Sequence, residues 1–183
     1  MPDPKSQPDP RTDSYARGGG ESVHAASYDR RMDGRSADIA VTVDLVAFTT
    51  RAAGLSVVLI QRKNPPYRGN WALPGGFLEV DEDLAEGASR EMSEETGLQV
   101  PPSRLTQVGA YGSPGRDPRM RTVSTVFTVL DDDLGSPLAG DDAASVQVWP
   151  VREVLADPEL LAFDHHQIML DALAVLGLED RLD

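Results

Sequence analysis

Three glutamates, Glu91, Glu94 and Glu95, stand close together in a segment with helical composition. At about 100° per residue, Leu84 and Ala88 define the apolar stripe of this helix. Glu91 and Glu95 fall inside or beside that stripe, and Glu94 falls on its flank. Carboxylates that point toward the protein body are costly unless they are paired or bound to a cation, and three so close together repel one another. The pattern therefore predicts a positive charge beside this helix.

A hard divalent cation is the partner that best suits this group of glutamates. Arg90 can neutralise only part of their charge, and oxygen ligands without His or Cys suit Mg²⁺ or Mn²⁺. Mg²⁺ held by a few carboxylates usually takes substrate phosphates as further ligands, which points to phosphoryl chemistry. The alternative is a solvated helix face, the usual meaning of such a charge run, and the overlap with the apolar stripe argues against it.

The elements that must position these glutamates can be predicted from local patterns. A helix over residues 83–96 is expected to carry them. Asp81 or Asp83 is the expected N-cap, and Gly97 the C-cap. A second amphipathic helix is expected at residues 165–176, and strands are expected at residues 39–48, 55–61, 105–111, 123–130 and 146–149. Together these predict an α/β fold with a mixed sheet and helices on both faces.

Composition narrows the classes of protein to which the chain can belong. It has 183 residues, with 17 Lys and Arg against 30 Asp and Glu, and no cysteine. The absence of cysteine excludes disulfides, thiolate metal sites and cysteine nucleophiles. The net charge of −13 argues against binding to a nucleic acid polymer or an anionic membrane. With no apolar run of membrane length and no signal-like segment, we expect a soluble, cytoplasmic protein.

The first part of the chain differs from the rest. Residues 1–36 are rich in proline, glycine and charge and poor in apolar side chains. Such a segment cannot bury enough surface to offset the entropy of ordering it. We therefore expect a flexible N-terminal tail over residues 1–36 and one domain over residues 37–183.

A longer pattern surrounds the glutamates. Residues 90–98 read Arg-Glu-Met-Ser-Glu-Glu-Thr-Gly-Leu, and Gly76 and Glu82 precede them at fixed spacing. At every defined position this resembles the signature of the Nudix hydrolase family, G-x5-E-x7-R-E-U-x-E-E-x-G-U. The resemblance implies an α/β/α sandwich, with metal-dependent hydrolysis of a nucleoside diphosphate that is linked to another moiety.

The resemblance also implies roles for individual residues. The metal, Mg²⁺ or Mn²⁺, is expected on three carboxylates and one backbone carbonyl, those of Glu91, Glu94, Glu95 and Gly75. The catalytic set is Arg90, which orients the glutamates, together with Glu94 and Glu95. Glu94 is the first choice for the base that takes the proton of water, and weaker alternatives are Asp141, Asp142 and Glu153.

A group of arginines bears on the substrate. Arg116, Arg119 and Arg121 lie close together in a chain that is otherwise short of positive charge, and arginine matches phosphate bidentately. Surface arginines that pair with Asp117 and the other abundant acids are the alternative. The segment resembles the Pro-x-Arg-Asp-Pro-Arg sequence of bacterial Nudix proteins that act on or sense ADP-ribose, although Met120 stands where glycine is expected. Residues 161–166, which contain a Phe-Asp-His element, resemble the same subgroup.

This second resemblance implies ADP-ribose as the substrate, hydrolysed to AMP and ribose 5-phosphate. The arginines expected at its phosphates or terminal ribose are Arg62, Arg116 and Arg119. The aromatic side chains that could stack on adenine are Trp71 and Tyr111, with Phe48 and Tyr67. For each of them a role in packing is an equal alternative, and the histidines His165 and His166 are more typical of capping or surface positions.

Two other functions stay open at this stage. One is a pyrophosphatase that removes non-standard nucleoside triphosphates or cleaves dinucleotides. The other is a regulator that binds ADP-ribose without cleaving it. The regulator is disfavoured, because few residues follow Trp149 and the acidic charge opposes DNA binding. Family members that hydrolyse ADP-ribose are often homodimers, so a homodimer is a further expectation.

Overall fold

The structure, a computed structural model, describes residues 38–51, 54–140 and 143–182. The tail expected at residues 1–36 lies outside the described residues. Within the described residues, no helix combines the length and the apolar character that crossing a membrane requires.

Strand β1 (Ile39–Arg51) is central to the sheet. One edge pairs in parallel with β6 (Arg121–Leu130). The other edge pairs antiparallel, first with β4 (Gly75–Phe77) and then with β2 (Gly54–Arg62). Both faces of the middle of β1 are buried, which explains why this stretch reads as an almost unbroken apolar run.

The remaining strands complete a mixed sheet. β5 (Thr106–Tyr111) pairs antiparallel with β6. β2 also pairs with β7 (Ala143–Pro150) and with β3 (Trp71–Ala72). All five expected strands are present. The sequence prediction missed β3 and β4, because strands of two and three residues among prolines and glycines look like a loop.

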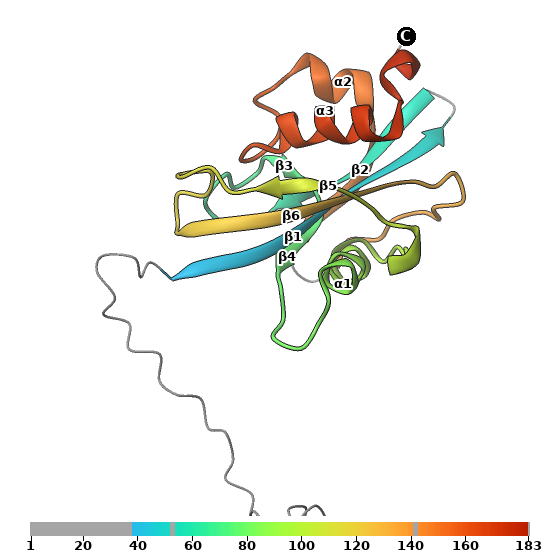
Figure 1. Cartoon of the computed structure of the whole chain (residues 1–183). Helices are drawn as coiled ribbons and strands as arrows, with labels where there is room; N and C mark the ends of the chain where they lie inside the picture. The colour runs from blue at the N-terminus through green and yellow to red at the C-terminus, as the bar shows by residue number, and fades with distance from the viewer. Residues whose placement is uncertain (1–37, 52–53, 141–142, 183) are drawn as a thin grey trace, which may run out of the picture. The chain divides into compact units, whose positions relative to one another are not determined.

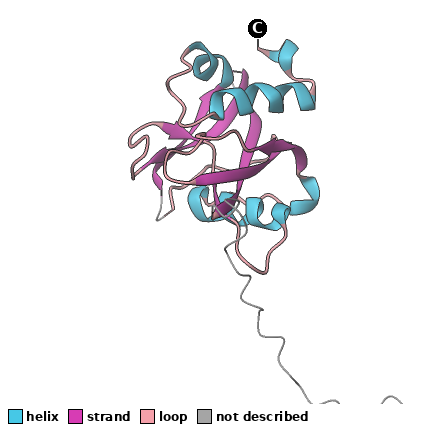
Figure 2. Ribbon diagram, turned by 60° about the vertical axis from the view of Figure 1, so that its left-hand side comes forward, coloured by secondary structure: helices cyan, strands magenta, loops and turns pink. Residues whose placement is uncertain are grey.

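Helices cover both faces of the sheet, as Figures 1 and 2 show. Helix α1 (Leu84–Thr96) lies on one face, and α2 (Val151–Ala156) and α3 (His165–Leu176) lie on the other. Short 3-10 turns are η1 (Pro102–Arg104) and η2 (Glu179–Arg181). One apolar core lies between the sheet and α1, and a second lies under α2 and α3. The expected α/β/α sandwich is therefore confirmed.

The ends of α1 are fixed by local interactions. Asp83 is the N-cap, and its carboxylate accepts a hydrogen bond from the Ala85 amide at 3.2 Å. The Asp83 amide in turn donates to the Glu86 carboxylate at 3.2 Å, which completes a capping box. Gly97 ends the helix in the left-handed conformation, with φ 71°. The register of α1, and hence the direction of its glutamates, is set at both ends.

Candidate active site

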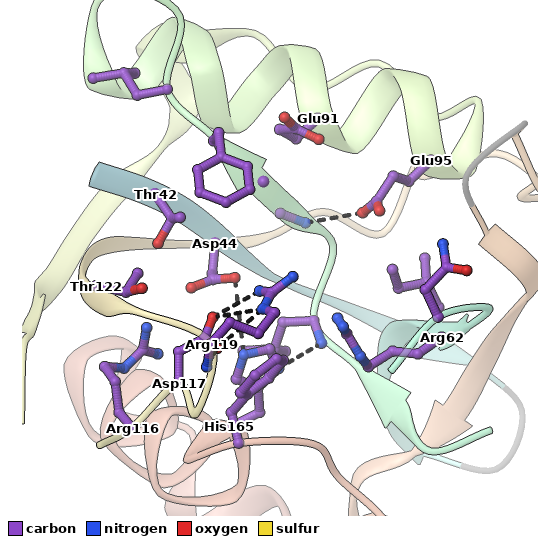
Figure 3. A pocket seen from close by; sticks show the side chains of 18 of the residues that line it. Thr42, Asp44, Arg62, Glu91, Glu95, Arg116, Asp117, Arg119, Thr122 and His165 are labelled. Carbon is purple, nitrogen blue, oxygen red and sulfur yellow. Dashed lines mark hydrogen bonds and ion pairs between the residues drawn. The ribbon is translucent and has the colours of Figure 1, made fainter. Parts of the chain in front are cut away.

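Two glutamates of α1 face the short strand β4. Glu95 is buried, and its carboxylate accepts the Gly75 amide hydrogen at 2.9 Å. Glu91 approaches Gly76 so closely that a Cβ on that glycine would lie 2.5 Å from the Glu91 Cδ and 2.7 Å from its Oε2. A side chain at position 76 would therefore displace the carboxylate, so this approach requires glycine. Figure 3 shows both carboxylates on the same side of the pocket.

Arg90 connects the glutamates to the loop before α1. Its Nε and Nη2 donate to the Glu82 carboxylate at 2.9 and 2.7 Å, a two-point contact. Its Nη1 donates to Glu91 at 2.9 Å and to Glu94 at 3.0 Å. The hydrogen bonds from Arg90 lower the pKa of Glu82. Burial raises the pKa of Glu91 despite Arg90, so Glu91 would gain from a further cation.

A pocket of about 560 Å³ lies next to these groups. The α1 glutamates lie on one side, and the rest of the lining includes residues from β1, β2, β4, β6, the loop at residues 112–120 and the start of α3. Figure 3 shows labelled side chains from several of these elements around the pocket. The polar residues of its lining include Asp44, Arg62, Arg90, Glu91, Glu95, Arg116, Asp117, Arg119 and His165. Negative and positive groups therefore face each other across one cavity.

The arginines of the pocket have different surroundings. The Asp164 carboxylate accepts two hydrogen bonds from Arg116, at 2.9 and 2.6 Å. Arg119 donates to Asp117 at 3.0 and 2.6 Å, and these hydrogen bonds lower the pKa of Asp117. Bidentate contacts of this kind fix the plane of each guanidinium.

Arg62 has an aromatic neighbour in place of a carboxylate. Its guanidinium lies 4.7 Å from the centre of the Phe163 ring, and its Nε donates to the Pro66 carbonyl at 2.9 Å. Among the described residues, no carboxylate forms an ion pair with it. Burial, followed by the nearby charge of Arg119, lowers the pKa of Arg62. An anion in the pocket would stabilise the charged form of Arg62 and so offset both effects.

Most residues that the sequence singled out come together in this pocket. Those that line it are Gly75, Arg90, Glu91, Glu95, Arg62, Arg116 and Arg119. Glu94 is outside the lining, and 59% of its side chain is exposed. Arg121 begins β6 and Glu153 lies in α2, both outside the lining. Asp141 and Asp142 lie outside the described residues.

The aromatic side chains expected at adenine lie elsewhere. Trp71 is buried in the core, where its ring meets Trp149 edge-on at 5.3 Å. Tyr111 packs against the same core, and its hydroxyl donates to Asp171 of α3 at 2.7 Å. Phe48 is fully buried. Tyr67 is also outside the lining; it is exposed and meets the Phe163 ring edge-on. The place of each ring follows from tertiary packing, which residue type alone does not predict.

Several residues of the pocket were not predicted from the sequence. Asp44 is a buried lining residue, and Phe163 also lines the cavity. The expectation of a capping or surface position for His165 is wrong, because this side chain is buried, accepts a hydrogen bond from the Leu73 amide and lines the pocket. A single aspartate within the apolar run of β1 was a usable signal, because an unpaired buried carboxylate is costly. The Phe-Asp-His element was noticed, but its side-chain directions depend on tertiary contacts.

The lining suits a hard divalent cation at the glutamates. The groups that could hold such a cation are the carboxylates of Glu91 and Glu95 and the backbone carbonyl of Gly75, all oxygen-bearing groups of residues that line the pocket. In the part of the chain that the structure describes, no three His, Cys, Asp or Glu side chains converge as a metal-binding group. A cation here would therefore complete its shell with water and substrate oxygens, as Mg²⁺ commonly does.

Comparison with known proteins agrees with this geometry. The NUDIX domain model matches residues 38–172. The chain is 44% identical to an ADP-ribose pyrophosphatase of Methanocaldococcus jannaschii over 115 residues, which are 63% of this chain and 64% of that protein. It is 35% identical to the ADPR responsive transcriptional repressor NtrR of Acinetobacter baylyi over 143 residues, 77% of this chain and 56% of the repressor. The chain thus spans less than two thirds of either relative.

A solved structure extends the comparison to the fold. The NUDIX domain of Shewanella oneidensis NrtR, crystallised with ADP ribose, has a TM-score of 0.70 and 33% identity to this chain. The match covers 80% of this chain and 94% of that domain. At this level of identity and coverage, the similarity extends through most of the described fold.

Proposed function

Because this chain belongs to the NUDIX domain family, we propose that it hydrolyses the diphosphate bond of ADP-ribose to give AMP and ribose 5-phosphate. The observation that carries the proposal is the pocket in which Glu91 and Glu95 face Arg62, Arg116 and Arg119. A diphosphate with a sugar on each side has negative charge that suits the arginines, and its oxygen atoms can be ligands of a cation held by the glutamates. It therefore fits between these two sides of the pocket. The archaeal pyrophosphatase relative supports the choice of ADP-ribose.

The proposed metal is Mg²⁺ or Mn²⁺, held by Glu91 and Glu95 with the backbone of Gly75, and by Glu94 if that side chain turns inward. The chemistry that such a cation supplies when bound is neutralisation of diphosphate charge and activation of water. Arg90 contributes by fixing Glu91 and Glu94 through its two hydrogen bonds. Its two hydrogen bonds to the Glu82 carboxylate keep the loop before α1 in place.

Arg62, Arg116 and Arg119 form the side of the pocket that we call the arginine wall, and this wall binds and orients the diphosphate. Arg116 and Arg119 present planes already fixed by Asp164 and Asp117, so little side-chain entropy is lost when an anion binds. Water then adds to one phosphorus as the bridging P–O bond breaks. The proton of that water goes to a glutamate of α1, and the released phosphate group leaves with the other half of the substrate.

The identity of the proton acceptor can be tested within α1. Glu94 was the first choice from sequence, but it is the exposed member of the three and is paired with Arg90. Glu91 and Glu95 line the pocket. Separate Glu→Gln variants at the three positions distinguish them: the base is the position whose variant loses kcat and the corresponding limb of the pH profile while metal affinity stays normal.

The repressor relative favours a second candidate function, in which the pocket senses ADP-ribose without cleaving it. The intact set of signature glutamates, Glu91, Glu94 and Glu95, favours hydrolysis, because binding alone does not need all of them. A triphosphate or dinucleotide substrate is the other alternative. The predicted cytoplasmic location and the predicted homodimer are part of the same proposal.

A substrate panel tests the proposed function. We would measure kcat/KM for ADP-ribose, for nucleoside triphosphates and for dinucleotides, each with Mg²⁺ and with Mn²⁺. Preference for ADP-ribose is the expected result. Preference for another nucleotide would overturn the substrate, and tight ADP-ribose binding without turnover of any compound would favour sensing.

A further inference from the structure

Phe163, at the approach to α3, has an uncommon backbone conformation. Its φ is 55°, in the left-handed region that bulky residues rarely adopt. Such a conformation is strained and persists where surrounding contacts enforce it, often at functional sites. Here the Ala162 amide donates to the Trp71 carbonyl at 2.8 Å immediately before the turn, and α3 begins at His165 immediately after it.

The Phe163 ring lies among the positive charges of the pocket. Besides Arg62 at 4.7 Å, the Arg119 guanidinium lies 5.9 Å from the ring centre. Tyr67, which also has a positive φ, meets the ring edge-on at 4.8 Å. Cation–π contacts hold a guanidinium at a fixed place over a ring without neutralising its charge. The ring can therefore hold two mutually repelling arginines in the same cavity.

The next residue, Asp164, contacts the third arginine. Its two oxygens accept from Arg116 at 2.9 and 2.6 Å, and the Arg116 side chain is only 6% exposed. An arginine buried to that degree needs a carboxylate to compensate for lost hydration. Asp164 therefore fixes the position of Arg116 in the arginine wall.

His165 contacts the Leu73–Gly75 segment, which lies on the side of the proposed metal site. Its Nδ1 accepts the Leu73 amide hydrogen at 3.0 Å, which places the ring proton on Nε2, 3.9 Å from the Asp44 carboxylate. Pro74 and Gly75, which follow Leu73, are also held in place. The Pro74 carbonyl accepts from the Leu45 amide at 2.9 Å, and the Gly75 amide donates to Glu95 of α1. His165 thus anchors the segment that ends at the proposed metal site.

We propose that Phe163, Asp164 and His165 form one positioning element, which sets the arginine wall relative to the Leu73–Gly75 segment. Phe163 and Asp164 act through the arginines on substrate affinity. His165 acts through Leu73 on the place of Gly75, and so on the metal. The three are positioning residues, since none needs to touch the reacting atoms, and the inference rests on the proposed diphosphate hydrolysis at this site.

Phe163 and Asp164 act on the arginine wall, and His165 acts on the Leu73–Gly75 segment. Variants of the first two residues should therefore change KM, whereas variants of His165 should change the metal requirement. Phe163→Leu and Asp164→Asn are expected to raise KM about tenfold, with kcat within about threefold and an unchanged Mn²⁺ requirement. His165→Ala is expected to raise the Mn²⁺ concentration for half-maximal activity. His165→Asn retains an acceptor near Nδ1 and is expected to restore much of that loss.

Matched variants exclude a purely structural role. Phe163→Tyr keeps the ring and is expected to keep the wild-type KM. Asp180→Asn is the control for Asp164→Asn, because it makes the same change at an aspartate of η2 that lies outside the pocket lining. Phe163→Gly removes the ring together with the left-handed strain, so it serves if the leucine variant unfolds; it is expected to keep Tm and still raise KM.

The proposal fails if these variants change KM, kcat and metal requirement together, or leave KM and the metal requirement unchanged in folded protein. All are measured with the nucleotide that the wild-type protein cleaves best. A wild-type preference other than ADP-ribose would therefore overturn the proposed substrate, while the split between KM and metal requirement would still decide the positioning role.

Discussion

One methyl group at Gly76 gives a sharp test of the geometry at Glu91. A Cβ there would lie 2.5 Å from the Glu91 Cδ, whereas carbon atoms in contact are about 3.5–4.0 Å apart. The carboxylate must retreat by about 1 Å, and a misplacement of that size can cost about 100-fold in rate. This corresponds to about 2.7 kcal/mol in the activation barrier.

Stability should hardly change in Gly76→Ala. The obstacle is the end of a side chain, and Gly76 does not have a left-handed backbone. The free energy of unfolding is therefore expected to stay within about 1 kcal/mol of the wild-type value. Gly135→Ala is the matched control, because its Cβ would meet only the Leu98 Cδ2, at 4.0 Å, and Gly135 does not line the pocket.

The assay is steady-state ADP-ribose hydrolysis with Mg²⁺, run beside thermal unfolding. Gly76→Ala is expected to keep its Tm and to lose about 100-fold in kcat/KM, and Gly135→Ala to match the wild type in both. Wild-type activity in Gly76→Ala would refute the reasoning that the place of Glu91 against Gly76 is needed for catalysis.

Three further predictions concern stability. Met92→Ala empties a fully buried position beneath α1 and is expected to lower the free energy of unfolding in urea by about 2–5 kcal/mol; a loss below about 1 kcal/mol would contradict the packing described. Asp83→Ala removes the capping box and is expected to cost about 1 kcal/mol, seen as a lower Tm with KM unchanged. Burial lowers the pKa of His165 from 6.5, so below that pH the unfolded chain binds a proton that the folded chain does not. Folding stability is therefore expected to fall as pH drops through 6.5 and below, and His165→Asn should show a shallower pH dependence of Tm.

Much of the fold could be predicted because its signals are local. Asp83 and Gly97 are capping residues in the right places, and the structure begins and ends α1 beside them. The β-branched run at β1 gave a buried strand. β3 and β4 have no such signal, since they are short and take their conformation from pairing with β2 and β1.

The glutamate side of the candidate site could be predicted from the sequence better than the arginine side. The angular position of Glu91 and Glu95 follows from helix geometry, and both line the pocket. The sequence could suggest the arginines and the pairing of a nearby acid such as Asp117 with one of them, but not the pairing of Arg116 with Asp164, which is 48 residues away. Trp71 and Tyr111 show the same limit, because which face of the sheet a ring occupies depends on tertiary packing.

Product analysis tests the central claim most directly. ADP-ribose would be incubated with the full chain and Mg²⁺, and the products separated and quantified, beside Glu95→Gln and a sample with chelator. Equal amounts of AMP and ribose 5-phosphate from the wild type, with neither product from the folded variant or the chelated sample, are predicted. Unchanged ADP-ribose in the wild-type reaction, or full turnover by Glu95→Gln, would contradict the account.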